Sequence, residues 1–153
     1  MPERKAWMEL NIKYENGTMT IYLENFLSWR NISKVKKLVK IIRSSHTPEC
    51  EGKIREYVEQ EMGQFEPRQQ DNEKHIVRHE EKIKSCQAKL DYYTASRDRH
   101  KKGSDSWKKH NQCVRQARQE LRGAKQLLRS RQADYNSNIR KREFYQKVLK
   151  ILV

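Results

Sequence analysis

The 153-residue chain has few of the residues from which catalytic and metal sites are built. It contains five glycines and three cysteines, and it has no glycine-rich phosphate loop, nucleophile elbow or His-Glu-x-x-His pattern. The pairs His46 with Cys50 and His75 with His79 each supply only half of a four-ligand zinc site. We therefore expect a non-enzymatic protein, with no catalytic residue, no metal, no cofactor and no small-molecule substrate.

Long apolar runs are also missing. The run Ile151–Val153 is far too short to cross a bilayer, so we expect no membrane association through a span. Only 35% of the residues are hydrophobic, which argues against a large globular core and favours elongated helices. The cysteines are odd in number and unclustered, and Cys86 and Cys113 are too far out of register to form a disulfide. Reduced thiols predict a cytoplasmic protein.

Positive charge is abundant, and its distribution is uneven. The net charge is +14, with 9 basic and 4 acidic residues in 1–47, 12 of each in 48–103, and 13 basic and 4 acidic in 104–153. A polyanionic partner would therefore meet the N-terminal segment and the last third of the chain.

Two apolar ladders mirror each other about a point between Gly103 and Ser104. Their members recur at alternating steps of three and four, which is the spacing of a coiled-coil seam. The mirrored pairs are Tyr93 with Val114, Leu90 with Ala117, Cys86 with Leu121, Ile83 with Ala124, and His79 with Leu128, and the two ladders end at Ile76 and Arg131, which face each other. Two such seams joined by a short polar loop predict an antiparallel helical hairpin.

Charged residues beside the seam agree with this register. The facing pairs are Lys89 with Glu120, Glu80 with Lys125, and His75 with Asp134. Each exposed pair contributes only about 0.2–1 kcal/mol, so these pairs select the register without supplying much stability. The seam itself is thin, and we expect a marginal coiled coil that depends on other parts of the protein or on a partner.

Residues 8–24 predict a β-hairpin. Apolar and polar residues alternate on both sides of Asn16-Gly17, a dipeptide typical of a two-residue type I′ turn. This turn would pair Tyr14 with Met19, Ile12 with Ile21, and Leu10 with Leu23. Trp29, in the segment that follows, is expected to lie in the core.

Helix signals organise the rest of the chain. Asn31 or Ser33 can cap a first helix, Thr47-Pro48-Glu49 begins a second, and Gly63 and Pro67 interrupt the second as a break or a kink. We expect a mostly α, α+β fold: a flexible leader at 1–7, a base formed by 8–66, a coiled-coil hairpin at 67–140 with its tip at 103–106, and a C-terminal helix end at 141–153 that packs on the base.

A line of basic residues is the main candidate binding surface. Arg115, Arg118 and Arg122 begin a series at steps of three and four that places one positive charge every ~5 Å along the helix. The full candidate set for nucleic-acid binding is Lys34, Lys37, Lys40, Arg43, Lys108, Lys109, Arg115, Arg118, Arg122, Lys125 and Arg129. A solvated face of an exposed coil is the structural alternative.

The tip of the hairpin is the second candidate. Its cations and rings, a possible contact for a partner, are His100, Lys101, Lys102, Trp107 and His110. Trp107 could stack on a base or fill a partner's pocket, or it could hold the loop against Arg97 and His100.

Three functions follow from these features. The first is nucleic-acid binding, to DNA or RNA, through the phosphate backbone. The second is an inhibitor or adaptor that acts on a nucleic-acid-processing complex, of which an anti-CRISPR type protein is one form. The third is a structural homodimer in which a second copy completes the thin seam. A short, basic chain of this kind is typical of phage and other mobile-element proteins.

Overall fold

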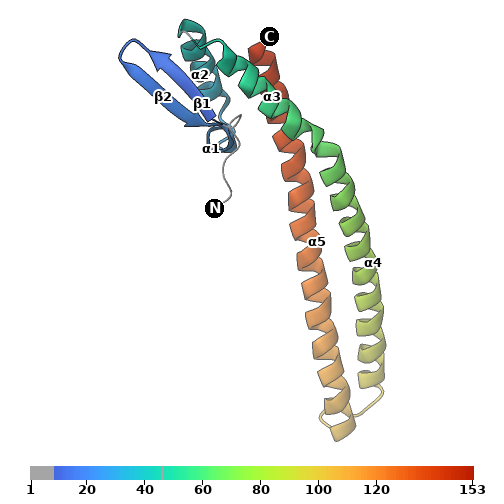
Figure 1. The fold of residues 1–153 in the computed structure, drawn as a ribbon. Helices are drawn as coiled ribbons and strands as arrows, with labels where there is room; N and C mark the ends of the chain where they lie inside the picture. Colours follow the sequence, from blue (N-terminus) through green and yellow to red (C-terminus); the bar gives the residue numbers. More distant parts are fainter. Residues whose placement is uncertain (1–8, 46) are drawn as a thin grey trace. The chain divides into compact units, whose positions relative to one another are not determined.

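The computed structural model describes residues 9–45 and 47–153, so the predicted leader lies outside the described residues. Its elements are β1 (Glu9–Tyr14), β2 (Gly17–Tyr22), α1 (Leu23–Ser28), α2 (Ile32–Ser44), α3 (Glu49–Gly63), α4 (Phe65–Asp98) and α5 (Asp105–Leu152) (Figure 1). The predicted fold class, mostly α with an N-terminal β-hairpin and long packed helices, is confirmed.

The chain forms two compact units. Met1–Pro67 together with Asn138–Val153 make up the first, called here the core unit, and Arg68–Ser137 make up the second, called the hairpin unit. The long helices α4 and α5 each contribute residues to both units.

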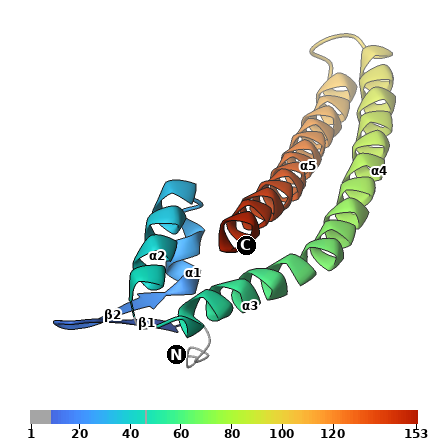
Figure 2. The ribbon, with the colours of Figure 1, turned by 90° about the horizontal axis from the view of Figure 1, so that it is seen from above.

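The core unit buries one continuous apolar cluster. Within this unit, α1 and α2 lie on one side of the β-hairpin (Figure 2). The buried residues are Leu10 and Ile12 of β1, Leu23 and Leu27 of α1, Val35, Leu38, Val39 and Ile42 of α2, Cys50, Ile54, Tyr57 and Val58 of α3, and Phe144, Tyr145, Val148 and Leu152 of α5. The sequence predicts that the hairpin and these helices pack together, because each has one apolar face.

Two arginines hold the end of α5 in the core unit. Arg43 donates to the carbonyl of Ile151 at 3.4 Å, and Arg55 donates to the carbonyl of Leu152 at 3.1 Å. The last carbonyls of a helix have no partner within the helix, and cations are favourable at this end of its dipole. These contacts explain why α5 continues to Leu152.

The β-hairpin forms, but its predicted register and turn are wrong. Tyr14 pairs with Gly17, Ile12 with Met19, and Leu10 with Ile21, so the loop residues are Glu15 and Asn16. The positive φ of 151° falls on Gly17, whereas a type I′ turn needs positive φ at both loop residues. The register differs by two residues from the prediction, and a shift of two keeps every side chain on its predicted face.

Trp29 is exposed, contrary to the prediction. Its exposed fraction is 74%, and it follows α1, a short helix that the sequence pattern does not predict. Leu23 and Leu27 of α1 point into the core instead, so Leu23 is buried but is not a strand partner of Leu10. The next residue, Arg30, has a φ of 49° and turns the chain into α2.

The helix starts agree with the sequence, and of the two predicted interruptions Gly63 ends α3 whereas Pro67 does not break a helix. Asn31 caps α2 by accepting from the Lys34 amide at 3.2 Å, and α3 begins directly after Pro48. The break falls at Gln64, and Pro67 lies in the first turn of α4. Proline is tolerated in a first turn because the amide that it lacks would have no helical partner there.

In the hairpin unit, the parts of α4 and α5 within Arg68–Ser137 lie side by side (Figure 1). The predicted ladders lie at their seam: Cys86, Val114, Ala117, Leu121 and Ala124 are buried, and Ile83 and Leu90 pack against Cys86, Leu121 and Ala124. The connection is shifted from its predicted place, because Asp105 and Ser106 already belong to α5 and the loop is 99–104. Ser104 caps α5 by accepting from the Trp107 amide at 3.2 Å, and Gly103 takes a φ of 86°.

The charge pairs are confirmed only in part. Lys89 Nζ lies 3.6 Å from Glu120 Oε2, as predicted. His75 Nε2 instead lies 3.6 Å from Asp71 of its own helix, and among the described residues Glu80 and Lys125 form no ion pair with each other. At the end of the seam, Arg131 donates to Asn72 at 3.2 Å and pairs with Asp71. These polar groups give the Arg131 guanidinium hydrogen-bond and ion-pair partners. The apolar side chain of Ile76, the predicted neighbour of Arg131, could not provide them.

Candidate nucleic-acid interface

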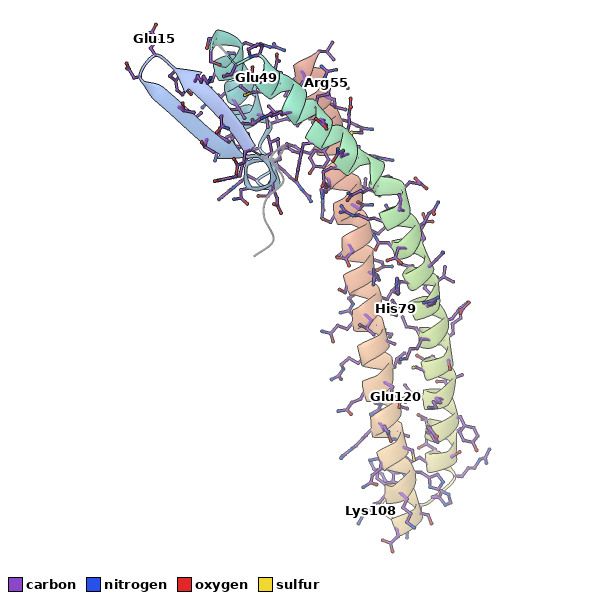
Figure 3. All side chains as sticks on the ribbon, viewed as in Figure 1. Glu15, Glu49, Arg55, His79, Lys108 and Glu120 are labelled. Carbon is purple, nitrogen blue, oxygen red and sulfur yellow. The ribbon has the colours of Figure 1, made fainter. Side chains whose placement is uncertain are left out.

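One side of α5 carries an uninterrupted line of cations, called here the α5 stripe: Arg115, Arg118, Arg122, Lys125 and Arg129. All five are exposed, and none forms a hydrogen bond or ion pair with another residue of the described chain. Lys108, labelled in Figure 3, lies seven residues before Arg115 and continues the same line. From Lys108 to Arg129 the line covers roughly 32 Å of helix at 1.5 Å per residue.

The seam fixes the orientation of the stripe. Each stripe residue directly follows a seam residue, as Arg115 follows Val114 and Arg122 follows Leu121. One residue of α-helix is a turn of about 100°, so a side chain that follows a buried one emerges beside the seam. Packing of α5 on α4 therefore presents the five cations on one flank.

A shallow groove of about 480 Å³ lies along the stripe. It is lined by Arg118, Leu121, Arg122, Lys125, Gln126 and Arg129. Four of these six side chains are cationic, and Gln126 adds an uncharged amide. Guanidinium groups in such an arrangement can donate two parallel hydrogen bonds to one phosphate.

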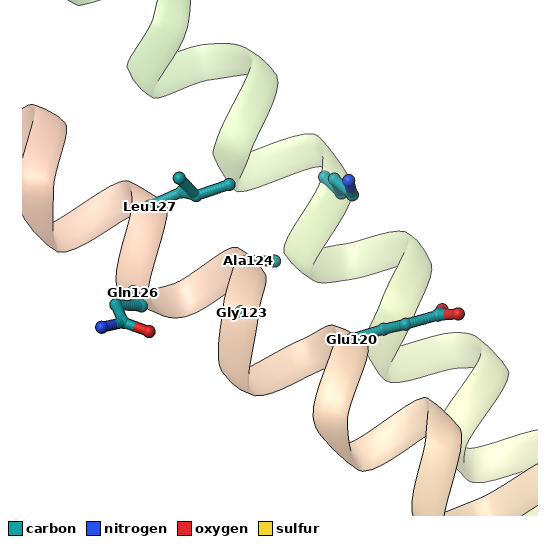
Figure 4. A pocket seen from close by; sticks show the side chains of 6 residues that line it. Glu120, Gly123, Ala124, Gln126 and Leu127 are labelled. Carbon is teal, nitrogen blue, oxygen red and sulfur yellow. The ribbon is translucent and has the colours of Figure 1, made fainter.

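The opposite flank of α5 has a different character. Glu120 lies on this flank and is ion-paired with Lys89. A hollow of about 620 Å³ beside it is lined by Lys82, Glu120, Gly123, Ala124, Gln126 and Leu127 (Figure 4). Gly123 and Ala124 leave this surface hollow, and Leu127 is 51% exposed beside it. The stripe is therefore a property of one flank and not of the whole helix.

At the tip, rings from the two arms meet. The His100 and His110 rings lie 4.6 Å apart, and His110 Nδ1 is 2.6 Å from the Ser106 carbonyl. The Arg97 guanidinium lies 5.6 Å from the Trp107 ring, which is half-buried. Trp107 therefore holds the two arms together through Arg97, while Lys101, Lys102, Lys108 and Lys109 are exposed around it.

The basic residues of α2 are not equivalent. Lys34, Lys37 and Lys40 are exposed, and the Lys34 ammonium lies 5.1 Å from the Trp29 ring. Arg43, in contrast, pairs with Glu51 at 2.8 Å in addition to its bond to Ile151. Since Arg43 already serves the core unit, it is the least available cation of the predicted set.

No group of three or more metal-ligating side chains occurs in residues 9–45 and 47–153. The His75 and His79 rings lie 6.3 Å apart, and His46 is outside the described residues. Burial raises the pKa of the Tyr145 phenol well above its usual value, and the neighbouring Tyr57 and Glu61 add to this shift. Tyr145 belongs to the core cluster, where a neutral phenol is the stable form.

Comparison of the chain with models of protein families, with curated proteins and with solved structures found no match. In the part of the chain that the structure describes, no helix is both long enough and apolar enough to cross a membrane.

Proposed function

We propose that the protein binds nucleic acid through the phosphate backbone, with the α5 stripe as the principal contact. The observation that carries this proposal is a set of five exposed cations in one line, with no ion pair among the described residues. Phosphate binding by Lys and Arg releases condensed counterions and needs no base readout. Lys108 and Lys109 lie at the tip end of the same helix and extend the contact.

The expected salt dependence follows from the number of cations. Five phosphate contacts predict a slope of log K against log salt of about −4.5 on duplex DNA and about −3.5 on a single strand. Between about 50 and 300 mM salt, the duplex affinity would fall on the order of 10³-fold. Anisotropy of labelled single- and double-stranded DNA and RNA measures this slope directly.

A triple variant tests the surface itself. Replacement of Arg115, Arg118 and Arg122 by Glu should abolish binding at physiological salt. The matched control replaces three exposed cations of α4, Lys74, Arg78 and Lys82, by Glu, which gives the same change in net charge on the other arm. Equal loss in both variants would mean that overall charge and not the stripe governs binding.

Two results would overturn the proposal. One is binding by the Arg115, Arg118 and Arg122 variant with an unchanged salt slope. The other is binding by the wild-type protein that disappears near about 150 mM salt, the level at which nonspecific attraction is screened. A stoichiometric protein partner that survives nuclease treatment would then favour the inhibitor or adaptor function instead.

A further inference from the structure

The largest exposed aromatic surface lies in the core unit, far along the sequence from the α5 stripe. Trp29 is 74% exposed, more than any other aromatic side chain that the structure describes. Burying a large apolar side chain stabilises a protein by about 1.5–3 kcal/mol, so an exposed tryptophan leaves this stabilisation unused. Such exposure leaves the ring available to a ligand.

The backbone around Trp29 is held on both sides. The Arg30 amide donates to the Leu27 carbonyl at 3.1 Å, and Asn31 caps α2. Arg30 between them is left-handed, a conformation that costs a non-glycine residue roughly 1–2 kcal/mol and persists only where its surroundings enforce it. The Trp29 ring is therefore presented outward by a defined corner between α1 and α2.

A cation lies beside this ring, in a basic segment of the chain. The Lys34 ammonium lies 5.1 Å from the ring centroid, and residues 23–47 contain six basic residues and only one acidic residue. An aromatic ring with adjacent cations is the arrangement that binds single strands, in which a base stacks on the ring and its phosphate meets the cation. An apolar protein partner would have to desolvate Lys34, which is costly.

The helix that precedes Trp29 is fixed on the core unit. Leu23 and Leu27 of α1 are buried, and Phe26 packs against the same apolar cluster. The Trp29 ring therefore projects from an anchored helix end.

We propose that Trp29, with Lys34, forms a stacking site for an unpaired base of single-stranded nucleic acid. This inference deepens the proposed function and rests on it, since it assigns the ligand class: a chain with free bases. A duplex keeps its bases stacked within the helix, so it can use the α5 stripe but not this site.

Variants separate the two contacts. Trp29→Ala should weaken binding of an oligothymidylate about 5- to 150-fold, the range expected for loss of one stacked base, and should leave duplex affinity unchanged. Trp29→Phe should retain most of the affinity because a ring remains. The matched control is Tyr92→Ala, which removes an aromatic side chain of similar exposure, 69%, from α4 in the hairpin unit.

A spectroscopic readout identifies the stacked ring. With Trp7 and Trp107 replaced by Phe, Trp29 is the one tryptophan left, and its fluorescence should be quenched saturably by the oligothymidylate but not by the duplex. Unchanged fluorescence at saturating oligothymidylate would overturn the stacking site. Circular dichroism of Trp29→Ala should match the wild type because the side chain is exposed.

The outcomes distinguish this site from the stripe. If Trp29→Ala binds both ligands as the wild type does while the Arg115, Arg118 and Arg122 variant binds neither, the stacking site is wrong and the proposed function stands. If only the Trp29 variant loses the single strand and the stripe variant is unaffected, the stacking site stands and the stripe is wrong. Equal losses on both ligands for Trp29→Ala, or loss of a nuclease-resistant protein partner, overturn the stacking site.

Discussion

Leu121→Ala tests whether the thin seam stabilises the hairpin unit. Leu121 is 8% exposed and contacts a small cluster formed by Cys86, Ala124, Ile83 and Leu90. Buried Leu→Ala changes cost about 2–5 kcal/mol, and the cost falls where the surroundings collapse into the space. Since Cys86 and Ala124 are small and the seam joins only two helices, we expect a loss near the lower limit, about 2–3 kcal/mol.

The assay is amide hydrogen exchange measured by mass spectrometry over residues 105–137, because it reports the opening of this part of α5 separately from the core unit. A loss of about 2–3 kcal/mol corresponds to exchange faster by about 30- to 160-fold. The control is Leu127→Ala on the same helix, which makes the same chemical change at a side chain that is 51% exposed. Its expected effect is below about 0.5 kcal/mol.

Similar acceleration in the two variants would refute this reasoning, because burial at the seam would then not distinguish Leu121 from Leu127. A large effect of Leu127→Ala that shrinks as the protein is diluted would have another meaning. It would show that a second copy covers Leu127, in agreement with the structural-dimer hypothesis.

Two further predictions concern the glycines and the buried phenol. Gly103→Ala should destabilise the protein by about 1 kcal/mol because the φ of Gly103 is 86°. Gly123→Ala should stabilise it by up to about 1 kcal/mol because this helical glycine has open space around its Cβ position. Urea denaturation measures both changes in the free energy of unfolding, and two changes of the same sign would contradict the argument. Burial raises the pKa of Tyr145 in the folded state above the unfolded value of about 10, so its stabilisation is complete below pH 10 and is lost above it. Urea denaturation at about pH 8 and pH 11 should show a smaller loss in Tyr145→Phe than in the wild type, and an equal loss would exclude this phenol as the cause.

The seam was predictable because its information is local and repeated. Alternating steps of three and four identify each arm, and the mirror relation about Gly103 aligns them without knowledge of any distant contact. Lys89 and Glu120 meet as expected. The polar end of the seam was less predictable from the sequence, because the long side chain of Arg131 can reach Asn72, which lies a turn away from its predicted neighbour.

The hairpin shows where a pattern is ambiguous. Alternation has a period of two, so registers that differ by two residues bury the same side chains and cannot be separated by hydrophobicity. The turn decides between them, and Asn16-Gly17 favoured the wrong one. Trp29 was missed for another reason: hydrophobicity predicts burial on average, but whether an apolar residue between two short elements faces inward depends on the tertiary packing of α1.

The candidate interface was predictable from the spacing and charge of its residues. In the folded helix, repulsion between these like charges lowers stability. Like charges three or four residues apart on a helix destabilise it by about 0.2–0.5 kcal/mol per pair. The α5 stripe has four such neighbouring pairs, from Arg115 to Arg129, so it costs the free protein about 1–2 kcal/mol. A single Glu at Arg122 would relieve two of these pairs without touching the seam, because the side chain is exposed. Stability alone therefore does not account for the stripe, whereas a polyanion bound along it converts the same repulsion into a source of affinity.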